Sequence, residues 1–172
     1  PTQINYQVPV GTSIGEAALT IKQNANVVAA GRLQIAPVAP GLFTVDSGGR
    51  GIVVATALRV KADGTQIYEP IAQFNSATSR YELLPIDLGP ETDQVFLVIL
   101  GTGFRNRSSL SAVSAVIGGV NCEVLFAGAQ GNLIGVDQAN IRLPRSLAGR
   151  NAVDLIFSAN GIVANTVNIG IK

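Results

Sequence analysis

The most suggestive catalytic pattern in the chain is Gly11-Thr12-Ser13-Ile14-Gly15, which matches the G-x-S-x-G motif of hydrolases. In those enzymes the serine lies on a strand-to-helix turn and gives its proton to a histidine. This chain of 172 residues contains no histidine. We therefore interpret Ser13 as part of a Ser/Gly turn between strands, and not as a nucleophile.

Side chains that could bind a metal ion are few. Without histidine, and with Cys122 as the single cysteine, the chain has no cluster of transition-metal ligands. Calcium needs several closely spaced oxygen ligands, and Glu91-Thr92-Asp93 and Asp46-Ser47-Gly48 each lack a third carboxylate nearby. We interpret both segments as solvated turns. For Asp137 we favour a buried carboxylate that accepts hydrogen bonds from a loop backbone. We expect no metal site and no cofactor.

Two further loops carry residues that other proteins use to bind anions. Gly101-Thr102-Gly103 resembles part of a phosphate-binding loop, but it lacks the lysine and the following helix, so we interpret it as a tight turn after a buried strand. Arg105-Asn106-Arg107-Ser108 is a short basic loop that contains an Asn-x-Ser sequon, and contact with an acidic polymer or a neighbouring subunit stays open for it. We interpret this second segment as a solvated loop.

The overall composition argues against nucleic-acid and sugar-binding sites. The net charge is +1, from 12 basic and 11 acidic residues, and there is no basic run, so nucleic acid is not an expected partner. Paired carboxylates for glycoside hydrolysis remain conceivable, but the chain has no tryptophan to line a sugar-stacking cleft. Its only tyrosines are Tyr6, Tyr68 and Tyr81. We predict that the protein is not an enzyme and has no catalytic residue.

The chain has the composition of a folded all-β protein. Hydrophobic residues make up 47% and charged residues 13%, which excludes disorder. The apolar residues are largely β-branched and the turn formers are abundant. The longest apolar run, residues 95–100, has the length of a strand and not of the roughly 18 residues that span a membrane, so we expect no membrane insertion. The start at Pro1 suggests either a mature product without its leader or an excised fragment.

Residues 138–169 repeat residues 3–35. Residues 3–9 align with residues 138–144 and, after a one-residue gap, Gly15 aligns with Gly149 and Ile35 with Ile169. Such repeats indicate copies of one structural unit. We expect residues 42–88 to supply partner strands for the truncated copy at residues 3–36. The alternative is an unpaired edge that is open to strand addition from another chain.

Hydrophobic alternation predicts many strands and almost no helix. Asp63-Gly64, Gly118-Gly119 and Asn160-Gly161 predict hairpin turns, and Gly89-Pro90 is the favoured domain boundary. We predict two tandem β-sandwich domains, residues 1–88 and 89–172, the second one immunoglobulin-like because it has six or seven short strands about ten residues apart. The predicted strands are 16–22, 27–35, 52–60, 66–68, 81–84, 94–100, 112–117, 122–126, 133–143, 152–157 and 162–171.

Several motifs resemble a known class of domains. In residues 90–172 the segments 101–104 (GTGF), 116–120 (VIGGV) and 124–128 (VLFAG) resemble the IPT/TIG class of immunoglobulin-like domains. The whole chain is similar to an uncharacterised C-terminal module of large secreted bacterial proteins, abundant in acidobacteria. That similarity lies in residues 40–44 (PGLFT), 86–90 (IDLGP), 137–138 (DQ) and 143–149 (LPRSLAG). It implies an extracellular β-sandwich that is appended to other domains, with no established activity and no defined functional residues.

Three functions follow as hypotheses. The favoured one is a non-enzymatic structural or adhesion module, extracellular or on the cell surface, whose partners are neighbouring domains. The first alternative is a subunit of an extracellular filament, which contacts identical subunits through strand addition or through head-to-tail packing that does not close. The second alternative is a carbohydrate-binding module for a surface polysaccharide.

Overall fold

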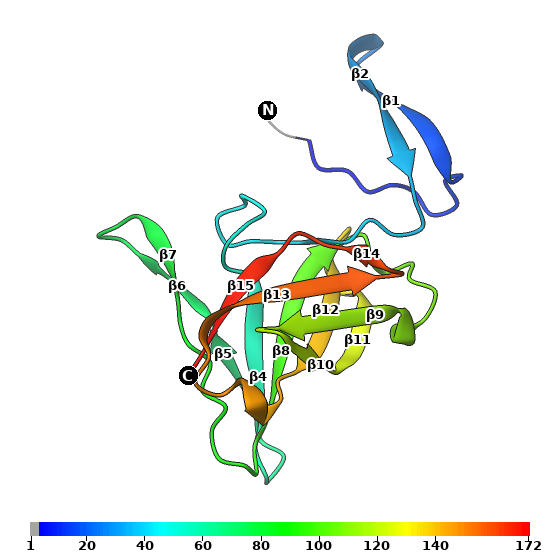
Figure 1. Ribbon diagram of the computed structural model, residues 1–172. Helices are drawn as coiled ribbons and strands as arrows, with labels where there is room; N and C mark the ends of the chain where they lie inside the picture. Colours follow the sequence, from blue (N-terminus) through cyan, green and yellow to red (C-terminus); the bar gives the residue numbers. More distant parts are fainter. Residues whose placement is uncertain (1–3) are drawn as a thin grey trace. The chain divides into compact units, whose positions relative to one another are not determined.

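The computed structural model describes residues 4–172, and within them the chain is built of β-strands without an α-helix (Figure 1). The predicted all-β class is confirmed. Two short 3-10 helices, η1 (Leu110–Ala112) and η2 (Arg145–Leu147), interrupt the strands. No helix in the described range is long and apolar enough to cross a membrane. The chain divides into two compact units, Pro1–Pro37 and Val38–Lys172.

The first unit is one hairpin. Strands β1 (Gly15–Gln23) and β2 (Asn26–Ile35) pair antiparallel and form a two-stranded sheet of their own. Asn24 adopts a left-handed conformation in the turn, with φ of 54°. Along β1, partly buried residues alternate with exposed ones, because successive side chains of a strand point to opposite faces.

One sheet of the second unit contains six strands. Their antiparallel order is β11 (Val124–Ala129), β12 (Asp137–Arg142), β8 (Gln94–Thr102), β4 (Ala55–Val60) and β5 (Gln66–Pro70), and the short β3 (Gly41–Leu42) pairs with the end of β8. In the central strand β8, Val95, Leu97 and Ile99 are buried on one face.

The other sheet of this unit contains five strands. The order is β10 (Val120–Cys122), β9 (Val113–Ile117), β13 (Asn151–Ala159) and β14 (Ile162–Val163), with β15 (Val167–Ile171) also paired to β13. The predicted hairpin turns Gly118-Gly119 and Asn160-Gly161 are confirmed, since all four residues have positive φ between paired strands. Beyond its pairing with β13, β15 forms parallel bridges with Ile52 and Ile86.

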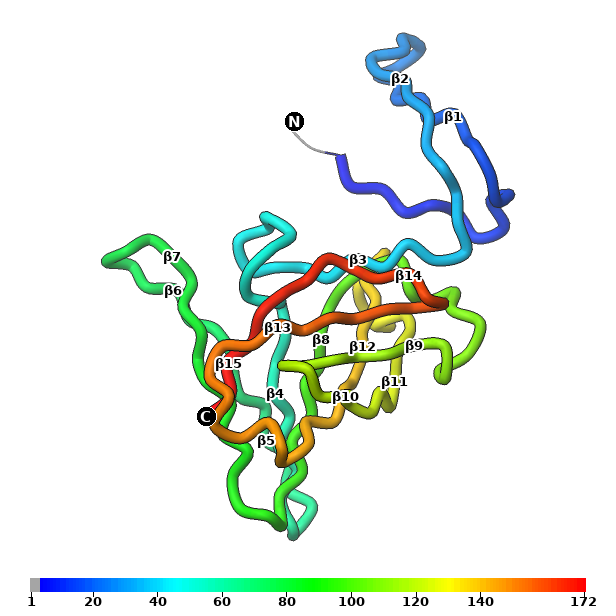
Figure 2. The backbone as a smooth tube through the Cα atoms, viewed as in Figure 1, coloured from blue at the N-terminus to red at the C-terminus, as the bar shows by residue number. Residues whose placement is uncertain are grey.

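A small hairpin projects from the body of this unit. Strands β6 (Ala72–Asn75) and β7 (Arg80–Leu83) pair only with each other among the described strands, and Figure 2 shows them extending away from the two larger sheets. Phe74 and Tyr81 lie opposite each other with ring centroids 5.2 Å apart. The sequence prediction missed β6, which has only four residues.

Both large sheets contribute side chains to a single core in the second unit. Leu97 and Ile141 come from the sheet of β8 and β12, and Ile117 and Leu155 come from the sheet of β9 and β13. The ring of Phe104 packs 5.0 Å from that of Phe157. Burial of each large apolar side chain contributes about 1.5–3 kcal/mol, so this core is the main source of stability.

The division into units differs from the expected domains at residues 1–88 and 89–172. Strand β4 pairs with β8, and Ile52 and Ile86 bridge to β15, so residues 42–88 complete the second unit and do not pair with the strands of residues 3–36 in the described range. Gly89-Pro90 lies in the loop before β8, inside the second unit. A Gly-Pro turn has the same chemistry within a domain as between domains, so it could not mark the boundary.

Candidate functional site

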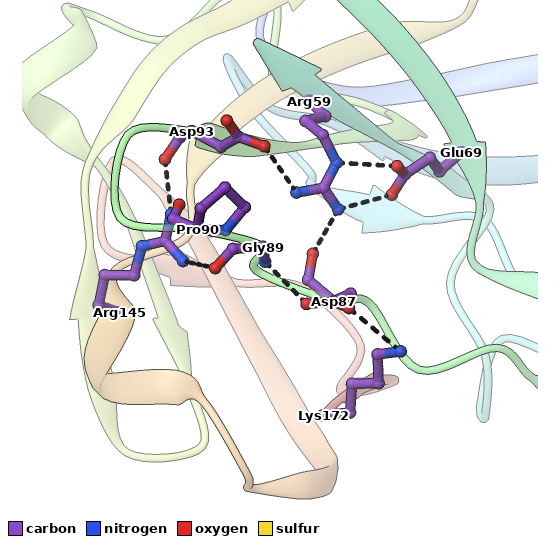
Figure 3. A network of polar contacts seen from close by, with 8 residues as sticks. All are labelled: Arg59, Glu69, Asp87, Gly89, Pro90, Asp93, Arg145 and Lys172. Carbon is purple, nitrogen blue, oxygen red and sulfur yellow. Dashed lines mark hydrogen bonds and ion pairs between the residues drawn. The ribbon is translucent and has the colours of Figure 1, made fainter. Parts of the chain in front are cut away.

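The most extensive polar network surrounds Arg59, on β4 (Figure 3). Its Nε and Nη2 donate to the two carboxylate oxygens of Glu69 on the adjacent strand β5, at 2.9 and 3.1 Å. Nη1 donates to Asp93 Oδ2 at 3.3 Å and Nη2 also donates to the carbonyl of Asp87 at 2.6 Å. The side chains of Arg59 and Asp93 are 9% and 8% exposed. The bidentate pair with Glu69 fixes the guanidinium group, and its bonds to Asp87 and Asp93 bind the loop that contains these two residues to the sheet.

A second arginine holds the same loop from another direction. Arg145, in η2, donates from Nη1 to the carbonyl of Gly89 at 2.6 Å and from Nη2 to the carbonyl of Asp93 at 2.7 Å, and it also contacts the carbonyl of Pro90. The carbonyl groups of residues 89, 90 and 93 therefore converge on one guanidinium group (Figure 3). Residues 89–93 belong to no strand, so their carbonyl groups are not bound in a sheet. The contacts with Arg145 satisfy these carbonyl groups and fix the backbone of the loop.

The C-terminal end of β15 adds a third contact to the loop. Lys172 Nζ lies 3.1 Å from Asp87 Oδ2, and the backbone N–H of Gly89 donates to Asp87 Oδ1 at 2.7 Å. These two groups, the Gly89 N–H first, hold the pKa of Asp87 below its ordinary value of 3.8. The hydrogen bonds that Arg59 donates to Glu69 raise the pKa of the guanidinium above its usual value, so it stays charged.

Beside this loop lies a small cavity of about 200 Å³. It is smaller than the roughly 300–1,000 Å³ of typical ligand pockets. Two of the charged groups at its edge, Asp93 and Arg145, are already bound within the network. The other two charged residues of its lining are Glu91 and Arg142, and Arg142 forms an ion pair with Glu123. Its lining residues are Leu88, Glu91, Asp93, Gln94, Val95, Arg142, Leu143, Pro144 and Arg145.

Asp137 has the role that the sequence predicted. It is fully buried, and its Oδ2 accepts hydrogen bonds from the backbone N–H groups of Phe104 and Arg105 at 2.8 and 3.0 Å. Its Oδ1 accepts a further bond from Arg105 Nε at 2.5 Å. This ion pair also changes the interpretation of the basic loop, because Arg105 is bound to Asp137. Ser108 in the same loop donates from its N–H and its hydroxyl to Asn160.

The structure places the other residues that the sequence singled out in separate parts of the chain. Thr12, next to Ser13, donates from its N–H and its hydroxyl to the carbonyl of Pro9, so the G-x-S-x-G segment begins in a turn, as predicted. Ser13 lies between this turn and β1, and no strand precedes the segment in residues 4–14. No α-helix follows it in the described range. Gly103 has φ of 80° directly after the buried strand β8, which confirms the tight turn. Cys122 is buried, and burial raises the pKa of its thiol.

The two acidic loops have different outcomes. Asp46 is exposed and accepts from the Gly48 N–H at 2.9 Å and from the Thr44 hydroxyl at 2.8 Å; these bonds lower its pKa, and the predicted solvated turn is confirmed. For Asp93 that prediction is wrong, because its side chain is buried against Arg59. Among residues 4–172, no group of three or more acidic, histidine or cysteine side chains is placed to hold a metal ion.

Sequence reasoning missed both arginines of the network. Arg59 carried a usable signal, because it lies two residues after Ala57 and thus on the same, buried face of the strand. A charged residue on a buried face requires a partner of opposite charge. Arg145 carried no comparable signal, since its partners are backbone carbonyls more than 50 residues away in the sequence.

The chain was compared with protein-family models, with curated proteins and with solved structures, and no significant match was found in any of the three comparisons. The charged groups of the network bind one part of the chain to another.

Proposed function

We propose that this protein is a non-enzymatic structural or adhesion module of an extracellular protein. Its second unit would be an immunoglobulin-like sandwich of the IPT/TIG type, whose characteristic motifs lie in residues 90–172. The observation that carries the proposal is the use of the buried charges: Arg59, Asp93 and Asp137 all bind neighbouring segments of the chain.

This use of charge supports a structural role and not a catalytic one. A catalytic acid, base or nucleophile must reach the substrate and have a pKa suited to its task. Here Arg59 is occupied by Glu69, Asp93 and a carbonyl, and Asp137 by three donors from residues 104 and 105. The contacts join residues that are ten or more positions apart, so they tie the loops to the sheets.

The extracellular assignment rests on the similarity of the sequence motifs to a module of secreted proteins. The internal repeat supports an arrangement of successive modules, in which neighbouring domains are the partners. A surface polysaccharide remains a weaker alternative, and a glycan array without any bound sugar would exclude it.

The proposal is tested by the oligomeric state of the purified chain. A passive module is expected to be a monodisperse monomer in light scattering at micromolar concentration. Assembly into larger particles at that concentration would contradict it.

The exposed apolar residues of the first unit favour a second candidate function, a self-associating subunit of an extracellular filament. Tyr6 and Val28 are 58% and 56% exposed, and unpaired strand edges promote pairing between chains. Electron microscopy of native material would show filaments in this case. Isolated particles alone would count against it.

A further inference from the structure

The hairpin of the first unit has one apolar face. Residues that pair across β1 and β2 lie on the same face, and the pairs Ala17–Leu33 and Ile21–Ala29 place apolar side chains together. The other face carries Glu16, which forms an ion pair with Arg32. A two-stranded hairpin is at best marginally stable in water unless further strands cover its apolar face. The residues of the apolar face are Ala17, Leu19, Ile21, Ala29 and Leu33, together with Ile35 at the end of β2, which is already buried.

The internal repeat shows how the same sequence pattern is covered in the second unit. Ile21 aligns with Leu155 and Leu33 with Val167, and both later residues are completely buried, whereas Ile21 and Leu33 are only partly buried. The difference in burial between the two copies is larger in residues 4–9, which precede the hairpin. Tyr6 is 58% exposed and its counterpart Ile141 is 0% exposed. Gln23, aligned with Phe157, is a polar exception.

Three strands from outside the later copy pair with it in the second unit. The segment that contains Ile141 is β12, which pairs with β8 on one side and β11 on the other. The strand that contains Leu155 is β13, which pairs with β9. In the first unit, residues 4–9 belong to no strand, and β1 and β2 pair only with each other among the described residues. The first copy therefore lacks equivalents of β8, β9 and β11.

We propose that the hairpin and residues 4–9 are the closing part of a second sandwich, whose other strands come from a segment of the same type as residues 38–137. This inference rests on the proposed structural role and names the partner. The segment would precede Gln3 in the same polypeptide, in the position that residues 38–137 have before Gln138.

The size of the surface favours a segment in the same chain over a separate partner. Nine residues of β1 are about 30 Å long, and the two paired strands of the hairpin are about 10 Å wide, so the face covers about 300 Å². Both partners together would bury about 600 Å², below the roughly 1,200–2,000 Å² of stable complexes between separate proteins. When the covering segment belongs to the same polypeptide as the hairpin, its effective concentration at the hairpin is high. A stable contact is then possible with a smaller buried area.

The test joins an extra copy of residues 38–137 directly ahead of Gln3 in the full chain. Hydrogen exchange measured by mass spectrometry then reports on residues 15–35. Peptides from these residues can be assigned because only residues 38–137 are present twice in the fused chain. We expect the backbone amides of β1 and β2 to exchange at least about tenfold more slowly in the fused chain than in the chain alone, because the added strands cover them. Unchanged exchange of residues 15–35 would overturn the proposal.

Two matched substitutions in the fused chain separate docking from general stabilisation. Ile21→Asp puts a charge on the apolar face and is expected to abolish the protection of residues 15–35. Thr20→Asp puts the same charge on the opposite face, where the later copy itself has Asp154, and is expected to keep the protection. Equal effects of the two substitutions would overturn the proposal.

Two further experiments test whether the covering strands come from the same polypeptide or from a separate one. Residues 38–137 added as a separate polypeptide at micromolar concentration are expected to give no protection. Protection of residues 15–35 that rises with the concentration of the unfused chain would mean that a second copy is the occupant, and would overturn the proposal. Failure of the structural role itself would be seen separately, as assembly of the unfused chain in light scattering.

Discussion

Two arginine–glutamate pairs in the second unit differ in what surrounds them. Arg59 and Glu69 are 9% and 34% exposed, and Asp93, which also binds this arginine, is 8% exposed. Arg142 and Glu123, by contrast, are 45% and 59% exposed. Water screens the exposed pair of Arg142 and Glu123. Loss of Arg59, in contrast, would leave the Asp93 carboxylate buried, where water solvates it poorly.

We therefore predict that Arg59→Met lowers the free energy of unfolding by about 3 kcal/mol, because Asp93 would remain buried without its partner. Urea denaturation followed by circular dichroism measures this change. The matched control is Arg142→Met, which removes an arginine from an exposed pair and is expected to cost no more than about 1 kcal/mol. Similar losses for both variants would contradict the interpretation of the network.

At the scale of the elements, tight turns join the strands, and glycine is needed at them for two different reasons. Gly103 and Gly119 have nearly the same backbone conformation, with φ of 80° and 81°. A Cβ atom at Gly103 would lie 2.0 Å from the carbonyl oxygen of Ala39, whereas a Cβ atom at Gly119 would meet nothing within 4 Å. The turn after β8 therefore needs glycine for space as well as for conformation.

Comparison of the two alanine variants tests this distinction. Gly119→Ala is expected to cost about 1–2 kcal/mol of stability, the usual penalty of a left-handed conformation. Gly103→Ala is expected to cost about 1–3 kcal/mol more, since the backbone of residue 39 must move away. The thermal midpoint of each variant in calorimetry gives the order, and equal midpoints would show that the chain at residue 39 yields without cost.

At the scale of the whole molecule, the segment Val38–Lys172 contains every strand of both of its large sheets. Its core draws on β4 as well as on β8, β9, β12 and β13. The first unit has one hairpin and no comparable set of covering strands in the described residues. The two units thus differ in how many strands their own described residues supply.

We predict that the fragment of residues 38–172 folds without the first unit. Its thermal midpoint is expected to lie within about 2 °C of that of the full chain, since its own strands complete its core. The fragment of residues 1–37 is expected to show no cooperative transition, because an isolated hairpin is marginal. Differential scanning calorimetry measures both. A shorter fragment that begins at residue 89 serves as the contrast and is expected not to fold, because it lacks β4 and β5.

Features that depend on neighbouring residues could be read from the sequence. The turns at Gly118-Gly119 and Asn160-Gly161 were predictable because positive φ is a local property of glycine and asparagine. Most strand segments were predictable for the same reason, as alternation is a property of a short run. The start of the strand predicted at residue 133 was too early, since Leu133 accepts a turn hydrogen bond from the Val136 N–H and β12 begins at Asp137.

Features that depend on distant partners could not be read in this way. Hydrophobic alternation shows that β4 is a strand with a buried face, but it does not show that its neighbour is β8 and not β1, because any strand with a complementary face satisfies the same pattern. The role of residues 42–88 and the burial of Asp93 follow from that long-range pairing. The sequence by itself determines the local backbone preferences and the internal repeat, because both depend only on the order of the residues. The tertiary structure decides which strands pair, because that choice depends on the packing of the complete core.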